Sequence, residues 1–494
     1  MIKIIKSVTL RALYLFSFVL PLQLVAQDFQ STLEGIQSEN NIVGMGVEVY
    51  CGGEQVTSYY GGLKNIGLQL PLNDETYFRV ASISKSFTAA GLMKALENSE
   101  YNLDDDISQA LGYPLRNPQF PDAIISYRML LSHTSSLQDG TGYNSFLTAT
   151  YTTEDIPNIS EVLIPEGEYY TTNMWRTESP GTFFTYSNIN YGLIGTLIEK
   201  LSEERFDIYM KNAILEPLDI QGSFNVNDIP DMNDLSVLYR DGNAQWDDYG
   251  GNYPPPFNLE YLPGTNGSLF APQGGLRCRA KDLIKFGLFL LDGGTYQGQQ
   301  ILQAESIAVM TSEQWDFNGF NGDDYFGLFR NWGLGLHRSQ GEEGFDKVFE
   351  NRLMWGHPGE AYGLISDLYV DPEADLALVF ISNGYSAGGS YGFAENSIFY
   401  APEEQTFEAI EAEFLSTCQT LSTIELSTDD AGCGKISNGE ISSDPHTHIR
   451  VIKTDGVTVA EGFEKISISY LSRGFYIICY DQGGEFCKQK LMIR

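Results

Sequence analysis

Positive charge is scarce in this chain of 494 residues: 30 Lys and Arg stand against 65 Asp and Glu, a formal net charge of −35. Binding to nucleic acid or to an anionic membrane surface needs a basic face, so the charge balance argues against both. Histidine is also scarce, and the sequence contains no HExxH or HxHxD metal motif. Bulk disorder is excluded because 42% of the residues are hydrophobic and 13% are aromatic.

Long apolar runs are absent after the first 26 residues, so no membrane span is expected in the mature chain. Residues 1–26 begin with positive charges at Lys3, Lys6 and Arg11 and continue into an apolar run that Pro21 interrupts. This pattern predicts a secretory signal peptide. The protein is therefore expected to be exported, and either secreted or attached to the cell surface.

Cysteine is sparse, and the six cysteines fit neither a zinc ribbon nor a disulfide-rich scaffold. An exported chain meets an oxidising compartment, so disulfides are expected, although the spacing leaves their pairing open. Four of the six follow residue 415, which suggests a small C-terminal unit with disulfides of its own. Cys479 and Cys487 flank a turn-like Gly-rich segment and are candidates for a cross-strand bridge.

The segment 27–416 mixes strand and helix patterns. Alternation of apolar residues predicts a strand at 43–50 with a hairpin partner at 55–61, and a hydrophobic strand region at 366–382 that is broken at Asp371-Pro372. Strands near both ends with helices between them indicate an α+β domain. The spacing of apolar residues predicts helices at 87–98, 189–201, 283–291 and 404–414. The Pro and Gly content of residues 250–275 predicts a surface loop.

The composition changes after Thr417. Residues 417–445 are rich in Ser, Thr, Asp and Gly and predict a linker, and 446–494 show short strand patterns split by glycines. A small all-β domain, of β-sandwich type, is therefore expected at the C-terminus. His446 and His448 resemble a metal-binding pair, but further ligands are missing, so an exposed loop is the favoured interpretation and no metal or other cofactor is expected.

Ser82 and Lys85 stand three residues apart at the start of a helix pattern, so they share one helix face. A serine hydroxyl is a weak nucleophile that needs an adjacent base. A lysine can serve as that base if burial lowers its pKa. The apolar residues that follow indicate a buried helix, where a solvated lysine is less expected; a capping serine with a surface lysine is the structural alternative.

Two further motifs follow in the chain. Tyr186 and Asn188 precede an apolar helix pattern; the tyrosine is a candidate for proton transfer and the amide for holding a substrate carbonyl. Gly356-His357-Pro358-Gly359 precedes the strand region at 366–382. Taken singly, a helix cap and a structural turn histidine explain these residues equally well.

In this order, the three motifs resemble those of the serine β-lactamase and penicillin-binding-protein superfamily, most closely its class C β-lactamase, D-alanyl-D-alanine carboxypeptidase and esterase branch. The resemblance covers most of residues 40–400 and includes FRVASISKSFTA, LLSHTSSL, PGTFFTYSNINYGLIGTLIEKLS and GGLRCRAKDLIKF. It implies a DD-peptidase-like antiparallel sheet flanked by helices, with a helical subdomain. It also implies two-step acyl transfer to water without a cofactor.

The resemblance implies that Ser82 is the acylated nucleophile and Lys85 its proton acceptor. Tyr186 would act as general acid and base, first toward the leaving group and then toward the water. The expected substrate is a small molecule or a peptide.

Three further roles are implied in the same way. Asn188 would orient Lys85 and the substrate. His357 stands where many relatives have Lys and would hydrogen-bond Tyr186 and tune its pKa. The oxyanion hole would consist of the backbone N–H groups of Ser82 and Glu360.

The third motif departs from the family pattern at Pro358 and at Glu360, which follows Gly359. Relatives that bind a substrate carboxylate tend to have Ser or Thr at the position of Glu360. A carboxylate there should repel an anionic substrate such as a β-lactam or a D-alanyl terminus. We therefore expect a neutral or cationic ester or amide as substrate, with a true β-lactamase or D,D-carboxypeptidase as the alternative. A non-catalytic exported binding protein on the same fold is the alternative of another class.

A rival nucleophile is Ser386 in Gly384-Tyr385-Ser386-Ala387-Gly388, with an overlapping match at Ser390. An α/β-hydrolase elbow has to lead directly into a helix and needs an acid and a histidine later in the chain. More glycine follows here, and the only later histidines are His446 and His448, so a Gly-rich loop is the favoured interpretation.

The C-terminal residues 466–494 carry a second resemblance, to the C-terminal sorting domain of type IX secretion cargo. It rests on Leu471, the Gly474-Phe475-Tyr476 strand, the Gly turn and the closing Lys490 to Arg494. It implies that the secretion machinery is a partner and that the tail has no part in catalysis. The cysteines depart from this pattern, and a small carbohydrate-binding or adhesion module is the alternative.

Overall fold

The computed structural model describes residues 29–256 and 261–422 and, beyond them, seven strands between 435 and 493. The predicted signal peptide (1–26) and most of the predicted linker (417–445) lie outside the described residues. Among the described residues, no helix is long and apolar enough to cross a membrane.

Nine strands form one antiparallel sheet in the order β11-β12-β13-β14-β15-β16-β1-β2-β3. Strand β1 pairs with both β2 and β16, so the first and last strand regions of the domain meet at the centre of the sheet. The nine strands are β1 (Gly44–Cys51), β2 (Glu54–Asn65), β3 (Leu70–Pro71), β11 (Trp315–Asp316), β12 (Asn331–Trp332), β13 (His337–Ser339), β14 (Met354–Ala361), β15 (Leu364–Asp371) and β16 (Leu376–Ser382).

Helices and short strands fill the segment between β3 and β11. A three-stranded sheet consists of β4 (Tyr77–Arg79), β8 (Arg277–Arg279) and β5 (Gly222–Ser223). One hairpin consists of β6 (Leu238–Arg240) and β7 (Asn243–Trp246), and another of β9 (Thr295–Tyr296) and β10 (Gln299–Gln300). The α-helices are α2 (Ser84–Glu97), α3 (Ser108–Leu111), α4 (Tyr127–Leu131), α5 (Thr141–Thr152), α6 (Ser160–Leu163), α7 (Asn188–Ser202), α8 (Phe206–Met210), α9 (Ala280–Leu291) and α10 (Ala304–Thr311). Shorter helical turns are η1 (Ala81–Ile83), η2 (Thr172–Met174), η3 (Lys211–Leu215), η4 (Val226–Asp228), η5 (Gly267–Phe270) and η6 (Tyr325–Gly327).

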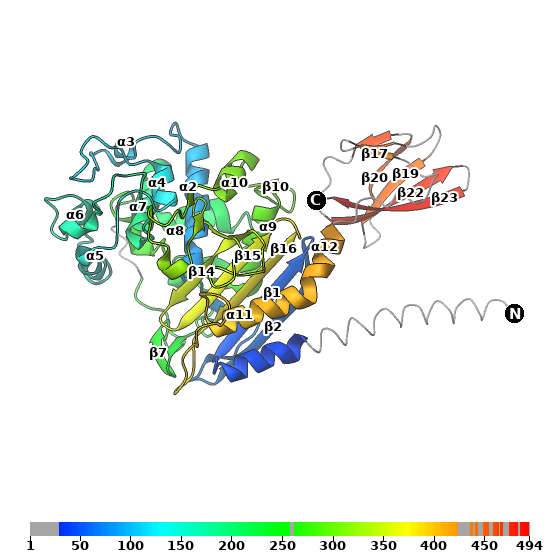
Figure 1. The fold of residues 1–494 in the computed structure, drawn as a ribbon, viewed down its shortest axis with the longest axis horizontal. Helices are drawn as coiled ribbons and strands as arrows, with labels where there is room; N and C mark the ends of the chain where they lie inside the picture. The colour runs from blue at the N-terminus through cyan, green and yellow to red at the C-terminus, as the bar shows by residue number, and fades with distance from the viewer. Residues whose placement is uncertain are drawn as a thin grey trace.

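The sheet is covered on both faces, and α3 to α8 gather to one side of it (Figure 1). Strand β16 is buried along its whole length, which explains its continuous hydrophobic sequence. Because side chains alternate along a strand, Ala377, Val379 and Ile381 join the core that contains α9, whereas Leu378 and Phe380 join the core on the other face. That second core contains the helix at 29–39 together with α11 (Ala401–Ile410), η7 (Glu411–Leu415) and α12 (Ser416–Ser422).

The predicted mixed α+β architecture is confirmed, and the main discrepancies concern element ends. The strand region at 366–382 is the β15–β16 hairpin, broken near Asp371 as predicted. Helices α2 and α9 begin three residues before the predicted starts, and α11 begins at Ala401, three residues before the prediction. Tyr400 and Glu403 form a capping box at that start, with Pro402 in the first turn, so capping and not apolar spacing determines where α11 begins.

One disulfide joins Cys51, at the end of β1, to Cys418 in α12. Cys418 therefore does not belong to a separate C-terminal unit, as the clustering of four cysteines suggested, but closes the larger domain. The predicted linker start at residue 417 lies inside α12. Cys278 is a buried free thiol.

The described C-terminal strands form two antiparallel sheets. In the β22–β23 register, Cys479 lies opposite Lys488 and Cys487 opposite Tyr480. The two cysteines are therefore not cross-strand partners, contrary to the sequence-based suggestion. The seven strands are β17 (Lys435–Ser437), β18 (Glu440–Ser442), β19 (His448–Lys453), β20 (Thr458–Phe463), β21 (Lys465–Ser467), β22 (Gly474–Gln482) and β23 (Glu485–Ile493).

Two buried carboxyl groups hold α11 against the sheet. Asp367 on β15 and Glu403 on α11 are almost fully buried and lie close enough for each to affect the acidity of the other. Burial and the neighbouring carboxylate raise the pKa of Asp367 well above its usual range, and burial also raises the pKa of Glu403. The two groups therefore carry protons in the folded protein at pH values where both would be ionised in the unfolded chain.

Because of this acid pair, we expect the folded protein to lose stability as the pH rises. Below about pH 4 the pair is protonated in both the folded and the unfolded state, and its contribution to the free energy of unfolding is complete. As the pH rises further, the two groups ionise in the unfolded chain first, and the free energy of unfolding falls until they also ionise in the folded protein. Glu403→Gln should therefore flatten the decline in urea midpoint between pH 5.5 and pH 8.5. The surface variant Glu343→Gln is the control and should keep the wild-type slope. An unchanged slope in Glu403→Gln would contradict the assignment.

Candidate active site

Ser82 and Lys85 meet at the start of α2. Ser82 lies in the 3-10 turn η1, and Lys85 lies in the first turn of α2. The Lys85 Nζ atom donates to the Ser82 Oγ atom at 3.0 Å and to the Gln273 carbonyl oxygen at 2.8 Å. Ser82 is half-buried, whereas Lys85 is fully buried. A solvent-accessible hydroxyl with a buried amine directly behind it is the arrangement that an activated nucleophile requires.

Burial is the main cause of the altered acidity of Lys85. It lowers the pKa of Lys85 to about 7, and the negative charge of Asp139 opposes this effect. A neutral amine is therefore well populated near physiological pH, and only the neutral amine can accept the Ser82 proton.

The turn that carries Ser82 has an unusual backbone and a close neighbour. Ala81, just before the serine, has a φ of +46°, which is uncommon for a residue with a side chain. Gly359 of β14 packs against this turn so tightly that a Cβ atom there would lie 2.8 Å from the Val80 carbonyl oxygen and 3.2 Å from the Ala81 Cβ atom. Glycine at 359 thus brings the backbone at 359–360 alongside Ser82.

The edge of β14 beside Ser82 is open. Strand β13 pairs with β14 only as far as Gly356, so in the described part of the chain His357 to Ala361 have no strand partner on the side away from β15. Gly359 and Glu360 lie on this open edge, and their part in an oxyanion hole stays a prediction.

Tyr186 lies over Lys85. The Lys85 Nζ atom is 4.9 Å from the centroid of the Tyr186 ring. Burial raises the pKa of Tyr186 well above its usual range, and a hydrogen bond with Ser82 acts in the opposite direction. Tyr186 is therefore a neutral hydroxyl that can donate a proton near pH 7, which leaves Lys85 as the group suited to accept one.

Asn188 does not orient Lys85 as expected. Its side-chain Nδ2 atom donates to the Asp139 carboxylate at 2.9 Å, and the backbone N–H groups of Asn188 and Ile189 donate to the same carboxylate. Asp139 thus caps the N-terminus of α7, which begins at Asn188. The described contacts include no hydrogen bond between Asn188 and Lys85, and Asp139 provides the only link between them, through its charge.

His357 lies near Tyr186 but is not hydrogen-bonded to it. The two ring centroids are 6.0 Å apart, and the His357 Nδ1 atom is 2.6 Å from the Pro358 carbonyl oxygen. The Nε2 atom is buried without a hydrogen-bond partner among the described residues. Burial and the charge of Lys85 lower the pKa of His357 well below its usual range, so it is a neutral ring. The expected hydrogen bond to Tyr186 is therefore absent from this arrangement.

Two residues that the sequence reasoning did not assign to the site lie within it. One is Asp139; the other is His133, which lies 4.7 Å from Tyr186 between ring centroids and accepts a hydrogen bond from the Ser187 backbone. Burial lowers the pKa of His133 well below its usual range, so it is neutral. His133 belongs to LLSHTSSL, which the resemblance had marked as framework, and it has a φ of +56°, a conformation that the sequence alone does not reveal.

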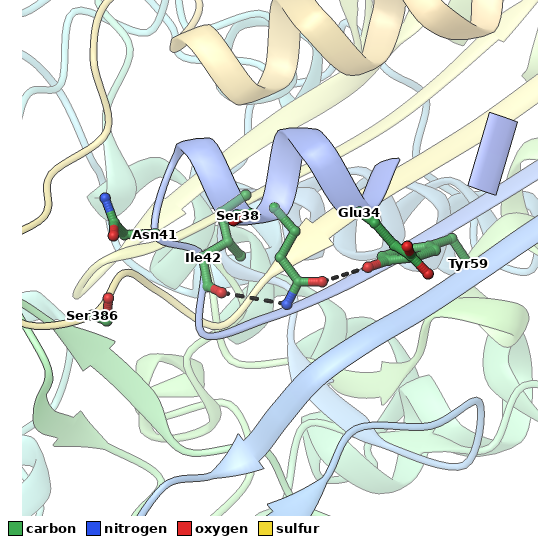
Figure 2. Close-up of a pocket in the computed structure, with 7 residues that line it drawn as sticks. Glu34, Ser38, Asn41, Ile42, Tyr59 and Ser386 are labelled. Atoms are coloured by element: carbon green, nitrogen blue, oxygen red, sulfur yellow. Dashed lines mark hydrogen bonds between the residues drawn. The ribbon is translucent and has the colours of Figure 1, made fainter. Parts of the chain in front are cut away.

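Ser386, the rival nucleophile, lies elsewhere. It lines an open pocket of about 350 Å3 beside the helix at 29–39, and Figure 2 shows it facing Asn41 at one end. Gln37 in that pocket accepts from the Tyr59 hydroxyl and donates to the Ile42 carbonyl. None of the residues that line the pocket is a histidine, so Ser386 has no base of the kind that a triad requires.

The Beta-lactamase family model matches residues 29–398. The chain belongs to the β-lactamase family. Penicillin-binding protein 4 of Amycolatopsis lactamdurans is 21% identical over 367 residues, which cover 72% of this chain and 84% of that protein. A β-lactamase of Yersinia enterocolitica is 27% identical over 44% of this chain, which spans about half (51%) of that protein.

Solved structures of β-lactamase-like hydrolases share the fold. EstCE1, described as a hydrolase with promiscuous acyltransferase activity, superposes with a TM-score of 0.58 at 19% identity and covers 79% of this chain and 99% of its own. D-amino acid amidase from Ochrobactrum anthropi SV3 has a TM-score of 0.56 at 20% identity and covers 78% and 99%. At these identities the likeness establishes the fold alone.

The acidity of Lys85 predicts how the reactivity of Ser82 depends on pH. The rate of labelling by a fluorophosphonate should rise as the pH increases through about 7, because the lysine then loses the proton that prevents it from acting as a base. Asp139→Asn should move the midpoint to lower pH, since it removes the charge that raises the pKa of Lys85. Lys85→Arg should abolish labelling, because arginine keeps its proton.

The matched control for this series is Lys94→Arg, which lies on the same helix and pairs with Glu97 at the surface. It should keep the wild-type profile. A labelling rate that does not change between pH 5.5 and pH 9 would contradict the role of Lys85.

Proposed function

We propose that this protein is an exported serine hydrolase that forms an acyl-enzyme at Ser82 and acts on a small ester or amide. The observation that carries the proposal is the contact of a fully buried Lys85 amine with the half-exposed Ser82 hydroxyl. Lys85 accepts the Ser82 proton as the oxygen attacks the carbonyl carbon, and the backbone N–H groups of Ser82 and Glu360 receive the developing oxyanion. Tyr186 donates a proton to the leaving group, and water then cleaves the ester at Ser82.

The charge near the site supports a substrate that is neutral or cationic at the reacting end. Glu360 is exposed, and its charge reaches Tyr325, whose ring lies 5.6 Å from that of Tyr186. The charge of Asp139 also reaches Tyr325, and it reaches Lys85. An anionic group held near these carboxylates is disfavoured, so amides and esters are better candidates than β-lactams. The D-amino acid amidase and the hydrolase with acyltransferase activity among the similar structures are compatible with this class.

The likeness to class C β-lactamases and D-alanyl-D-alanine carboxypeptidases supports the acyl-enzyme route but leaves their substrates as alternatives. The proposed export rests on the signal-peptide pattern at 1–26 and on the resemblance of 466–494 to a type IX sorting domain. We propose accordingly that 446–494 directs secretion or surface attachment and takes no part in the reaction.

The nucleophile can be identified by peptide mapping after reaction with a fluorophosphonate. The adduct is expected on the peptide that contains Ser82, and Ser82→Ala should remove it, whereas Ser386→Ala should leave it in place. An adduct on Ser386, or labelling that survives in Ser82→Ala, would refute the proposal. Absence of any adduct on the folded wild type would favour the non-catalytic binding protein.

The substrate preference can be measured with a neutral p-nitrophenyl ester and benzylpenicillin. We expect kcat/KM for the ester to exceed that for benzylpenicillin at pH 7.5, because the penicillin carboxylate meets Glu360. Glu360→Gln should narrow the difference between the two substrates, and Glu343→Gln should not. Efficient and saturable penicillin hydrolysis by the wild type would show that the β-lactamase alternative is correct.

A further inference from the structure

A second pocket begins one residue after the glycine that packs against the Ser82 turn. It has a volume of about 260 Å3 and lies at the end of the β14–β15 hairpin. We call it the dipolar pocket. Its walls include Arg240, Glu360, Leu364, Ile365, Tyr385 and Tyr400.

Two glycines with positive φ pack closely against the backbone of β6 beside this pocket. A Cβ atom on Gly363 would lie 2.1 Å from the Tyr239 carbonyl oxygen, and one on Gly384 would lie 1.9 Å from the same oxygen. Their φ values are +100° and +127°. The backbone next to Arg240 is therefore fixed between the hairpin turn and the segment that carries Tyr385, so the pocket is a product of close backbone packing.

Arg240 is exceptional among the arginines. Among the 11 arginines whose side chains the structure describes, Arg240 alone has a guanidinium with no ion pair or side-chain hydrogen bond. The ten that have such partners are Arg79, Arg116, Arg128, Arg176, Arg205, Arg277, Arg279, Arg330, Arg338 and Arg352. In a chain of net charge −35, carboxylates to pair with it are abundant. An unpaired guanidinium on a pocket wall is therefore suited to an anion that comes from outside.

Glu360 supplies the opposite charge. It forms no ion pair with any described residue, and its side chain contacts the Tyr400 hydroxyl. Side chains alternate along β14, so Glu360 points to the face opposite Gly359 while its backbone stays beside the Ser82 turn. The pocket thus has a carboxylate whose backbone lies beside the Ser82 turn, and a guanidinium that forms no ion pair with that carboxylate.

The rest of the wall is apolar or aromatic. Leu364 is buried, Ile365 lies opposite Glu360 in the β14–β15 register, and Tyr385 and Tyr400 complete the surface. The volume lies just below the ~300–1,000 Å3 of pockets that hold drug-sized ligands. A small ligand with an apolar side chain and two opposite charges fits this combination of size and chemistry.

We propose that the dipolar pocket binds an amino acid-type zwitterion with an apolar side chain, its ammonium group on Glu360 and its carboxylate on Arg240. A lone cation would be repelled by Arg240 and a lone anion by Glu360, whereas a zwitterion neutralises both charges at once. That this group is part of the substrate or product of Ser82 rests on the proposed function. The binding itself does not.

The probes are phenylalanine, as each enantiomer, and two analogues that each lack one charge. 3-Phenylpropanoate lacks the ammonium group and 2-phenylethylamine lacks the carboxylate. Calorimetric titration of the full-length protein at pH 7 should show that at least one enantiomer of phenylalanine binds about tenfold or more tightly than either analogue, as expected for one charge-assisted hydrogen bond.

Two variants assign the charges. Glu360→Gln should remove the advantage of phenylalanine over 3-phenylpropanoate, and Arg240→Gln should remove its advantage over 2-phenylethylamine. The exposed Glu39→Gln and Lys211→Gln are matched controls and should change neither ratio. The proposal is overturned if phenylalanine binds no more tightly than both analogues, if nothing binds, or if the two variants affect the ratios equally.

Labelling of Ser82 keeps this test separate from the proposed function. If the wild type reacts with the fluorophosphonate but does not bind phenylalanine, the zwitterion pocket is wrong and the serine hydrolase stands. If phenylalanine binds with the expected charge dependence but Ser82 never reacts, the pocket stands and the hydrolase is wrong. When both hold, bound phenylalanine should slow the labelling of Ser82, and Glu360→Gln should weaken that protection.

Discussion

The desolvation of a single amine is the constraint on which the rest of the site depends. Lys85 lies on a helix that is buried almost all round, between the sheet and the helical side of the molecule. Its ammonium form loses hydration there and gains in return a serine hydroxyl, a carbonyl oxygen, the faces of two tyrosine rings and the field of Asp139. The same burial keeps Tyr186 protonated and His133 and His357 neutral. One cause therefore sets the protonation of the whole cluster, with a base beside the nucleophile and neutral rings around it.

Close backbone packing is the second constraint. Gly359 has to lack a side chain for β14 to approach the turn before Ser82, and Ala81 adopts a left-handed conformation in that turn. Neither feature contributes a reacting group. Both determine where the backbone of β14 lies relative to the serine oxygen, and hence whether two N–H groups can converge on one oxygen.

The sequence predicted the elements and the central pair of the site well, because both depend on local pattern. The helix face that joins Ser82 to Lys85 is a matter of three-residue spacing, and the β15–β16 hairpin is visible in its break at Asp371. The partners of Asn188 were mistaken because the cap on α7 comes from Asp139, 49 residues earlier in the chain.

Longer-range features could not be read from spacing at all. Cys51 and Cys418 are 367 residues apart, and the rotamer of His357 depends on the Pro358 carbonyl oxygen and on a wall of aromatic rings. Arg240 stands out only once the other arginines with described side chains are seen to have partners, and Glu360 only because it lines the same pocket. Such features depend on which segments the fold brings together, and a single sequence does not encode that information in its local pattern.

The disulfide has a mechanical consequence. Cys418 is the last cysteine of the larger domain and is tied to β1, a central strand that pairs with β2 on one side and β16 on the other. A pulling force on the chain after Cys418 therefore reaches β1 through a covalent bond and bypasses α11, which lies before Cys418 in the chain. If the protein is held by its tail at a surface, tension between tail and domain would load β1 and its hydrogen bonds to β2 and β16.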